Sequence, residues 1–147
     1  MCVIIVSMNE SEKDEREYEC STTLIITGEE LNPDEVTQLL HLEPSQSWRR
    51  GELKQPSIGN QSVYEFGGWK LFITDDRREQ YLEKQLLHWY DLLKPKHEIF
   101  HEFNRRGFSL QLDCFITTDE AVSIYLDLEL QKKLIKISVD IALSVSA

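Results

Sequence analysis

The residues that come nearest to a known chemical motif lie at positions 97–101. His97-Glu98-Ile99-Phe100-His101 has the H-E-x-x-H spacing. In zinc hydrolases this spacing places two imidazoles one turn apart on a helix, with the glutamate as the general base. Such a site needs a third ligand. No other histidine follows, and the nearby downstream acids are Glu102, Asp113 and Glu120.

The helix that would carry this motif directs its histidines away from the core. Its apolar face is formed by Ile99, Phe100 and Phe103, so His97 and His101 are expected to face solvent or a shallow flank. Catalytic zinc histidines instead lie at the floor of a cleft, oriented by further hydrogen bonds. We therefore predict a surface helix, no cofactor, and adventitious metal binding at most. A zinc hydrolase built on this motif remains the most remote alternative.

A second stretch, residues 45–52, combines an aromatic ring, two guanidinium groups, a glycine and an acid between two regular regions. Arg49 and Arg50 could present their guanidinium groups to a carboxylate or phosphate, with Trp48 as a rigid wall. Trp48, Arg49, Arg50, Glu52 and Trp69 are then the candidate binding residues of a small-anion sensor.

The same stretch also has a structural interpretation, which we favour. Trp48 would fill the gap between the first helix and the sheet, and Gly51 would make a turn. The arginines would pair with Glu52 or with the acidic N-terminal segment. Trp69 and Trp89 lie within periodic elements and are predicted to belong to the core.

Nucleophilic catalysis has little support in the sequence. The cysteines Cys2, Cys20 and Cys114 are odd in number and have no C-x-x-C spacing, so neither a disulfide framework nor a zinc knot is indicated. Cys20 and Cys114 lie within predicted strands, where an activated thiol is not expected. The chain has no Ser-His-Asp order and no phosphate-binding glycine loop.

The net charge of the 147-residue chain is −10, and it is concentrated near the N-terminus, where ten acids up to Glu35 face only Lys13 and Arg16. A field of this sign repels nucleic acid and attracts a basic protein partner. A solvated tail over residues 1–17, or a short extra strand there, is the simpler interpretation. The candidate acidic partner surface consists of Glu12, Asp14, Glu15, Glu17, Glu29 and Glu30.

In the first half of the chain, β-branched residues predict a strand over 18–27 that stops at Gly28. Asn32 and Glu35 form a capping box around Pro33, which predicts a helix that ends before Pro44. Its apolar stripe is Val36, Leu39 and Leu40. Residues 62–66 and 69–74 are predicted to be two strands joined by a tight turn at Gly67-Gly68.

In the second half, Leu82, Leu86, Trp89 and Leu93 have helical spacing, preceded by a possible capping box at Asp76 and Glu79. Pro95 restarts a shorter helix that ends before Gly107. Residues 108–116 and 137–145 alternate as strands, 122–126 form a further short strand, and Asp127 caps a helix running to about residue 136.

These elements predict a single α+β domain over residues 18–147, with helices on one face of a mostly antiparallel sheet in two layers. Each half runs strand, helix, strand, which is compatible with a duplication. The chain has no basic leader and no stretch long enough to cross a membrane, so a cytoplasmic protein without membrane contact is expected.

The order of these residues resembles a bacterial domain family of unknown function, number 4279. The resemblance covers residues 20–145 and includes Asn32-Pro33-Asp34-Glu35-Val36-Thr37, the segment Ser47-Trp48-Arg49-Arg50-Gly51-Glu52 and Trp69. It implies a small α+β domain of cytosolic type and no established activity. Families of this kind sometimes occur beside toxins as immunity proteins, which is an association and not an activity.

The sequence thus favours a non-enzymatic protein-binding module. In its most concrete form this is an immunity protein or inhibitor that occupies a basic toxin or nuclease. The small-anion sensor and the zinc hydrolase are the alternatives.

Overall fold

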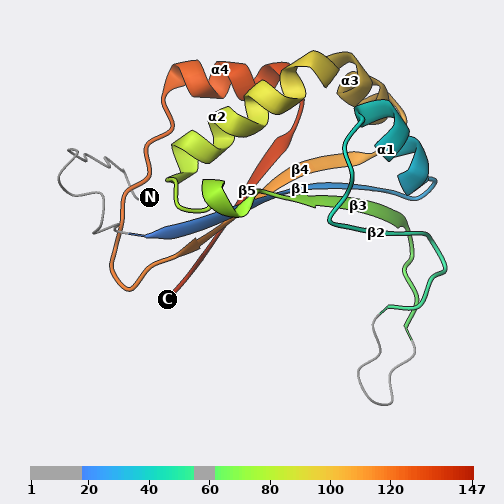
Figure 1. Ribbon diagram of the computed structural model, residues 1–147, viewed down its shortest axis with the longest axis horizontal. Coiled ribbons are helices and arrows are strands. Elements are labelled where there is room, and N and C mark those ends of the chain that lie inside the picture. The colour runs from blue at the N-terminus through green and yellow to red at the C-terminus, as the bar shows by residue number, and fades with distance from the viewer. Residues whose placement is uncertain (1–17, 55–61) are drawn as a thin grey trace.

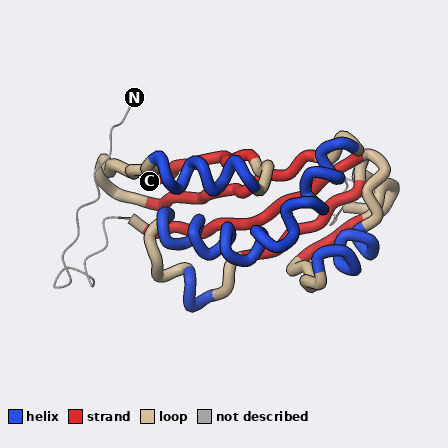
Figure 2. Tube along the Cα trace, turned by 90° about the horizontal axis from the view of Figure 1, so that it is seen from above, coloured by secondary structure: helices blue, strands red, loops and turns tan. Residues whose placement is uncertain are grey.

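The computed structural model describes residues 18–54 and 62–147. The predictions for residues 1–17, including Glu12, Asp14, Glu15 and Glu17, lie outside the described residues. The predicted α+β fold is confirmed, with the helices α1, α2, α3 and α4 lying over one face of a five-stranded sheet (Figures 1 and 2).

The sheet has the strand order β2-β3-β1-β4-β5 (Figure 1). The central strand β1 pairs antiparallel with β3 and β4, and β2 pairs antiparallel with β3. β5 runs parallel to β4 and forms one edge, while β2 forms the other. The strands are β1 (Glu19–Gly28), β2 (Gln46–Trp48), β3 (Gly67–Phe72), β4 (Ser109–Thr117) and β5 (Asp140–Ser146).

The helical layer consists of α1 (Pro33–Leu40), α2 (Leu82–Leu93), α3 (His97–Arg105) and α4 (Leu128–Lys136), with short 3₁₀ turns at η2 (Asp75–Arg77) and η3 (Lys94–Lys96). Helices α2 and α4 lie side by side, and α3 continues from α2 toward α1 (Figures 1 and 2).

The core forms between the two layers because the strands alternate and the helices have apolar stripes. The alternate residues Leu110, Leu112, Cys114 and Ile116 of β4 are buried, as are Cys20, Thr22, Leu24 and Ile26 of β1. The predicted stripe of Leu82, Leu86, Trp89 and Leu93 on α2 meets them, and Phe100 and Phe103 of α3 are fully buried.

The predicted start of α1 is partly confirmed. The Asn32 side chain accepts a hydrogen bond from the Asp34 amide at 3.0 Å, and Pro33 occupies the first turn. The capping box is wrong, because the Glu35 carboxylate pairs with Arg106 at the end of α3 instead. Leu39, predicted to join the apolar stripe, is 38% exposed.

The predicted hairpin at Gly67-Gly68 is wrong. Both glycines belong to β3, where they pair with Gly28 and Thr27. A Cβ at Gly67 would overlap the Leu31 carbonyl, so this glycine permits close backbone packing and not a turn.

Residues 62–64, which precede β3, pair with residues 51–54, which follow β2. They do not form a hairpin with β3. The Gly51 and Lys54 amides donate to the Tyr64 and Ser62 carbonyls at 2.8 and 2.9 Å, and Leu53 bridges to Val63. These contacts make a two-stranded arm that extends from the end of β2 and the start of β3 toward the side of the sheet without helices (Figure 1).

Two further sequence predictions in the second half need correction. Asp76 lies in η2 and Glu79 in the turn that follows it, and α2 starts at Leu82 without a side-chain cap, so no capping box forms there.

Residues 122–126 are not a strand. They belong to the crossover between the parallel strands β4 and β5, and Val122 and Ile124 pack against the core as part of that connection. Asp127 does cap α4, accepting from the Leu130 amide at 2.8 Å.

The alternation of β5 does not lead to full burial, contrary to expectation. Leu143 and Val145 lie in register with Cys114 and Ile116, yet they are 50% and 63% exposed. β5 is an edge strand, so its side chains have sheet neighbours on one side only.

The two halves of the chain also differ in strand pairing. β1 and β3 are antiparallel while β4 and β5 are parallel, so the fold gives a duplication no support.

Candidate functional site

Trp48 lies at the sheet edge, on the face that carries no helices. It is in register with Gly68, and its neighbour Ser47 is in register with Trp69. Because adjacent strand residues point to opposite faces, Trp48 and Trp69 lie on opposite sides of the sheet. The predicted placement of Trp48 between the first helix and the sheet is therefore wrong. Trp69 is the residue there: it is fully buried, and its indole N–H donates to Thr37 Oγ1 of α1 at 3.0 Å.

Four contacts hold the half-buried Trp48 ring. It stacks on Tyr64 with ring centroids 4.9 Å apart, and the Lys70 ammonium lies 5.5 Å from its centre. Its N–H donates to the Phe66 carbonyl at 3.1 Å. The ring also lies directly over Gly68, where any Cβ would overlap it. Trp48 thus joins β2 to the arm and to β3.

Arg49 and Arg50 are already paired with acids. Arg49 forms an ion pair with Asp34 of α1, and Arg50 lies 3.2 Å from Glu30 and 3.6 Å from Glu29. These partners belong to the acidic first quarter of the chain, which is one of the two alternatives the sequence left open. Because the pairs are exposed, each contributes little stability, but together they hold the turn against the β1–α1 connection.

The turn itself forms as predicted. Gly51 has a φ of 89°, and the Glu52 amide donates to the Arg49 carbonyl at 3.1 Å. Glycine adopts this left-handed conformation without steric cost. The backbone carbonyl of Glu52 accepts from the Tyr64 amide at 2.9 Å, and its side chain is exposed.

The five candidate binding residues therefore do not converge on one pocket. A shallow hollow of about 600 Å³ lies beside Arg50 and Gly51 and is lined by Glu29 and by residues 63–66 of the arm. Neither Trp48 nor Trp69 lines it. Its charged groups are of both signs, and Arg50 pairs with Glu29 across it.

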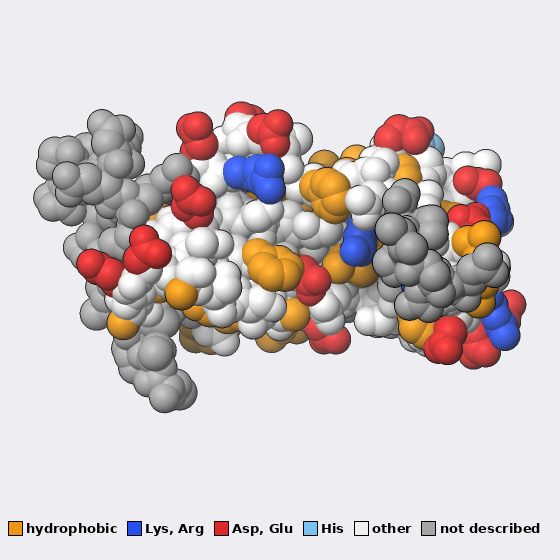
Figure 3. Space-filling view, turned by 90° about the horizontal axis from the view of Figure 1, so that it is seen from below, with side chains coloured by type: hydrophobic (Ala, Val, Ile, Leu, Met, Phe, Trp, Pro, Cys, Tyr) orange, Lys and Arg blue, Asp and Glu red, His pale blue; other side chains and the backbone are white. Residues whose placement is uncertain are grey.

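The helix-free side of the sheet, which we call the open face, is a larger exposed surface. Two phenylalanines stand on it: Phe72 of β3 is 43% exposed and Phe115 of β4 is 57% exposed. Figure 3 shows apolar side chains across this face, with acidic side chains among them and toward its margin. By register, it also carries Ser21, Thr23, Ile25, Thr27, Trp48, Lys70, Gln111, Asp113 and Asp140.

A hollow of about 440 Å³ lies at the end of the open face, beside Phe115. Its other lining residues include Glu19 and Thr117 at the strand ends, and Arg78 and Glu79 from the segment before α2. A phenyl ring can pack against the aliphatic part of a lysine or arginine side chain, and two carboxylates can pair with its charged group.

Phe72 and Phe115 were not among the predicted site residues, although the sequence carried a signal for both. Along β4, Ser109, Gln111 and Asp113 mark the polar face, and Phe115 continues that face as a large apolar residue. In the predicted strand 69–74, Phe72 alternates with the core residue Trp69 and therefore also belongs to the polar face. Two aromatic residues on the polar faces of strands mark apolar surface that is open to a partner.

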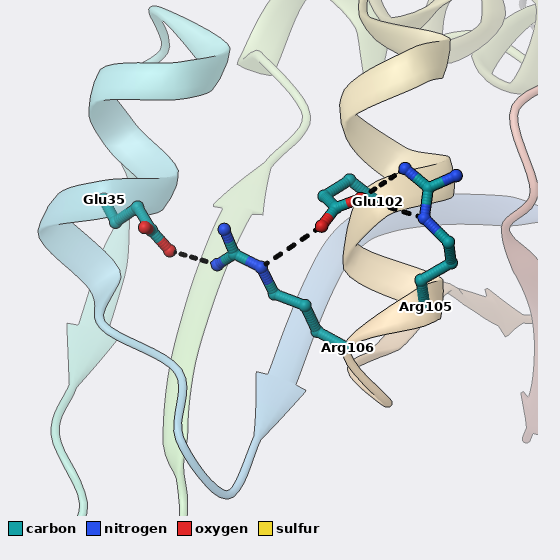
Figure 4. Close-up of polar contacts among 4 residues, drawn as sticks. All are labelled: Glu35, Glu102, Arg105 and Arg106. Atoms are coloured by element: carbon teal, nitrogen blue, oxygen red, sulfur yellow. Dashed lines mark hydrogen bonds and ion pairs between the residues drawn. The ribbon is translucent and has the colours of Figure 1, made fainter.

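A second ion-pair network connects α1 to α3. Arg106 pairs with Glu35 of α1 and lies 3.8 Å from Glu102, which in turn pairs with Arg105 (Figure 4). The hydrogen bond from Arg105, together with its charge, lowers the pKa of Glu102. The arginine pair at the end of α3 thus has structural partners.

The histidine pair is placed as the sequence predicted. His97 and His101 are exposed on α3, and their rings meet edge to face with centroids 5.8 Å apart. Within the described residues, no three histidine, cysteine, aspartate or glutamate side chains are grouped so that they could hold a metal ion. A third zinc ligand is therefore not supplied by any described residue.

The described cysteines are buried on the helix-covered face. Burial raises the pKa of Cys20 and of Cys114 to about 12, which keeps both thiols protonated at neutral pH. Beside them, Gln85 donates to the Cys20 carbonyl at 2.8 Å, and Trp89 donates to Thr22 Oγ1 at 2.7 Å. This buried polar network is structural.

Comparison with known proteins gives one match. A family model described as a domain of unknown function (DUF4279) matches residues 17–147. No curated protein and no solved structure matches the chain. None of the helices in the described parts of the chain has the length and apolar character that a membrane crossing requires.

Proposed function

Because this chain belongs to the DUF4279 family, whose description carries no activity, we propose its function from its surface. We propose that it is a non-enzymatic protein-binding module that holds a basic partner on the open face. An immunity protein or inhibitor that occupies a basic toxin or nuclease is the most concrete form of this proposal.

The observation that carries the proposal is the pair of exposed phenylalanines, Phe72 and Phe115, on a sheet face that no helix covers. Aromatic side chains at the centre of a surface dominate the binding energy of protein interfaces. Exposing two such rings on one face adds no packing energy to the domain, so a partner that covers them supplies a physical reason for their position.

The charge of the protein supports a basic partner. The net charge is −10, and Glu19, Asp113 and Asp140 on the open face exceed the single lysine, Lys70, that lies among the described strands there. A surface of this sign speeds the approach of a basic protein and repels nucleic acid. The hollow beside Phe115 has two carboxylates, Glu19 and Glu79, against one cation, Arg78, so an inserted arginine or lysine suits its net charge.

The sensor alternative at Trp48, Arg49 and Arg50 receives less support. Both guanidinium groups have carboxylate partners, so an anion there would have to compete with Asp34, Glu29 and Glu30. Trp69 lies on the other face of the sheet and cannot contribute to that site.

The test is a pull-down from the native host with the full chain as bait, followed by binding measurements on each recovered protein. Phe115→Ser should weaken binding of a basic partner at least about tenfold, since an exposed aromatic anchor is lost. Leu128→Ser is the matched control, because Leu128 is 63% exposed but lies on α4 in the helical layer. Recovery of no basic protein, or equal loss in both variants, would refute the proposal.

A further inference from the structure

A third hollow lies in the helical layer, on the side of the sheet opposite the open face. It measures about 430 Å³ and is lined by residues from the C-terminal ends of α2 and α4 and from the start of α3. Figure 1 shows these helix ends close together. Its lining comes from Tyr90 and Lys94, from His97 and His101, and from Ile135, Lys136 and Ile137. It is independent of the proposed partner surface.

The hollow is cationic in an acidic protein. Lys94 and Lys133 approach the Tyr90 ring, with their ammonium nitrogens 5.8 and 5.7 Å from its centre. Lys136 lies on the wall formed by α4. Since charged groups of one sign repel, gathering three lysines here is unfavourable unless something negative offsets them.

No acid in the described parts of the chain fills that role. In residues 18–54 and 62–147, no carboxylate lies within ion-pair distance of Lys94, Lys133 or Lys136. The arginines elsewhere behave differently, because Arg49, Arg50, Arg105 and Arg106 all have carboxylate partners. Among the described residues, only solvent and the Tyr90 ring meet the charge of these lysines, so an anion entering the hollow would not have to displace a carboxylate.

Helix dipoles account for the positions of the lysines but not for those of the imidazoles. Lys133 and Lys136 lie in the last turn of α4 and Lys94 is the C-cap of α2, where cations are favourable. His97 is the first residue of α3, where the dipole gives a cation no such stabilisation. Its Nδ1 donates to the Lys94 carbonyl at 3.0 Å, so its Nε2 can donate to an anion only in the imidazolium form.

We propose that this hollow binds a small organic anion, a phosphate or carboxylate that carries an apolar body. The anionic head would meet Lys94, Lys136 and the two imidazoles, and the body would pack against Tyr90, Ile135 and Ile137. Small-molecule sites typically have this volume and this combination of apolar walls with a few polar groups. A metal ion is a poorer fit, because the lysine ammonium groups repel it and only two ligand-type side chains are present.

The experiment is a titration of the full-length protein by ¹H–¹⁵N NMR with three probes: phenyl phosphate, 3-phenylpropionate and inorganic phosphate. Phenyl phosphate or 3-phenylpropionate should shift the amides of His97, His101 and Lys136 with a Kd below about 1 mM. The two organic probes distinguish a phosphate head from a carboxylate head. Inorganic phosphate should bind more weakly, because it has no body to pack against the apolar wall.

Matched charge variants identify the site. Lys94→Gln and Lys136→Gln should each raise the Kd about fivefold, since each removes one charged contact. Lys84→Gln on α2 and Lys132→Gln on α4 remove the same charge from exposed positions outside the hollow and should leave the Kd unchanged within twofold. Equally weakened probe binding in all four variants would show a diffuse attraction between the anion and the surface charge. The absence of amide shifts with every probe up to about 10 mM would exclude a site. Either result overturns the proposal.

Discussion

At the scale of single residues, register decides what each tryptophan does. Trp48 of β2 and Trp69 of β3 lie on adjacent strands near the same sheet edge. Trp48 lies on the open face, whereas Trp69 lies in the core. The residue that makes the open-face position possible is Gly68, because Trp48 occupies the space that a side chain at that position would need.

Gly68→Ala should therefore lower the free energy of unfolding by about 1–2 kcal/mol, because the new methyl group displaces the Trp48 ring. Urea unfolding followed by far-UV circular dichroism measures this change. In a Trp48→Ala background the same substitution should be neutral or slightly stabilising, since the overlap is gone and alanine restricts the unfolded chain. An equal cost in both backgrounds would show that contact with Trp48 is not the cause.

At the scale of elements, α1 and α3 are connected by charge as well as by the core. Glu35 of α1 reaches Arg106, and Glu102 of α3 holds both Arg105 and Arg106 (Figure 4). The capping box predicted for α1 is lost because Arg106 binds the Glu35 carboxylate. Arg106 follows α3, far from Glu35 in the sequence, so local sequence could not reveal this partner.

This network predicts a pH dependence of stability. The Arg105 hydrogen bond and charge lower the pKa of Glu102 in the folded state, so the unfolded state binds its proton first as the pH falls. The stabilisation is complete above the unfolded value of about 4.3 and is lost as the pH falls through the lower folded value. Between about pH 5 and pH 3, Glu102→Gln should therefore lose less stability than the wild type.

Thermal unfolding across this pH range checks the effect. Glu120→Gln is the control, since Glu120 is exposed in the connection between β4 and α4 and no ion pair holds its carboxylate among the described residues. This substitution removes a carboxylate but keeps the Glu102–Arg105 pair, so it should leave the pH dependence caused by that pair in place. High salt should reduce the difference between wild type and Glu102→Gln, because exposed ion pairs are screened. Identical slopes for Glu102→Gln and the wild type would contradict the role of Arg105.

At the scale of the whole molecule, the helical layer protects the interior of the sheet. Cys20 and Cys114 lie on the covered face, and burial raises the pKa of each thiol to about 12. Only the thiolate reacts readily with disulfide reagents, so both cysteines should react only when the domain opens.

In a Cys2→Ser variant at pH 8, Cys20 and Cys114 should react with a disulfide reagent no faster than the domain unfolds, and urea should accelerate both together. The release of the chromophoric thiol measures the rate. Ser109→Cys supplies an exposed reference thiol on β4 that should react at once in the native protein. Rapid reaction of Cys20 or Cys114 in native buffer would show local opening of the layer.

Patterns confined to one stretch of chain were sufficient to predict much of this molecule. The β-branched residues of β1, the alternation of β4, the stripe of α2 and the caps at Asn32 and Asp127 predicted these elements and the α+β class, because each depends on neighbours in sequence. The turn at Gly51 was predicted for the same reason.

Only the tertiary structure decided the rest. Glycines at positions 67 and 68 look like a turn in sequence, but close packing against Leu31 and Trp48 is what requires them. The ion-pair partners of Arg49 and Arg106, the separation of Trp48 from Trp69, and the approach of Lys133 to Tyr90 all depend on residues far apart in the chain. The sequence determines where a side chain stands along its own element, whereas the folded arrangement determines which groups from other elements it meets.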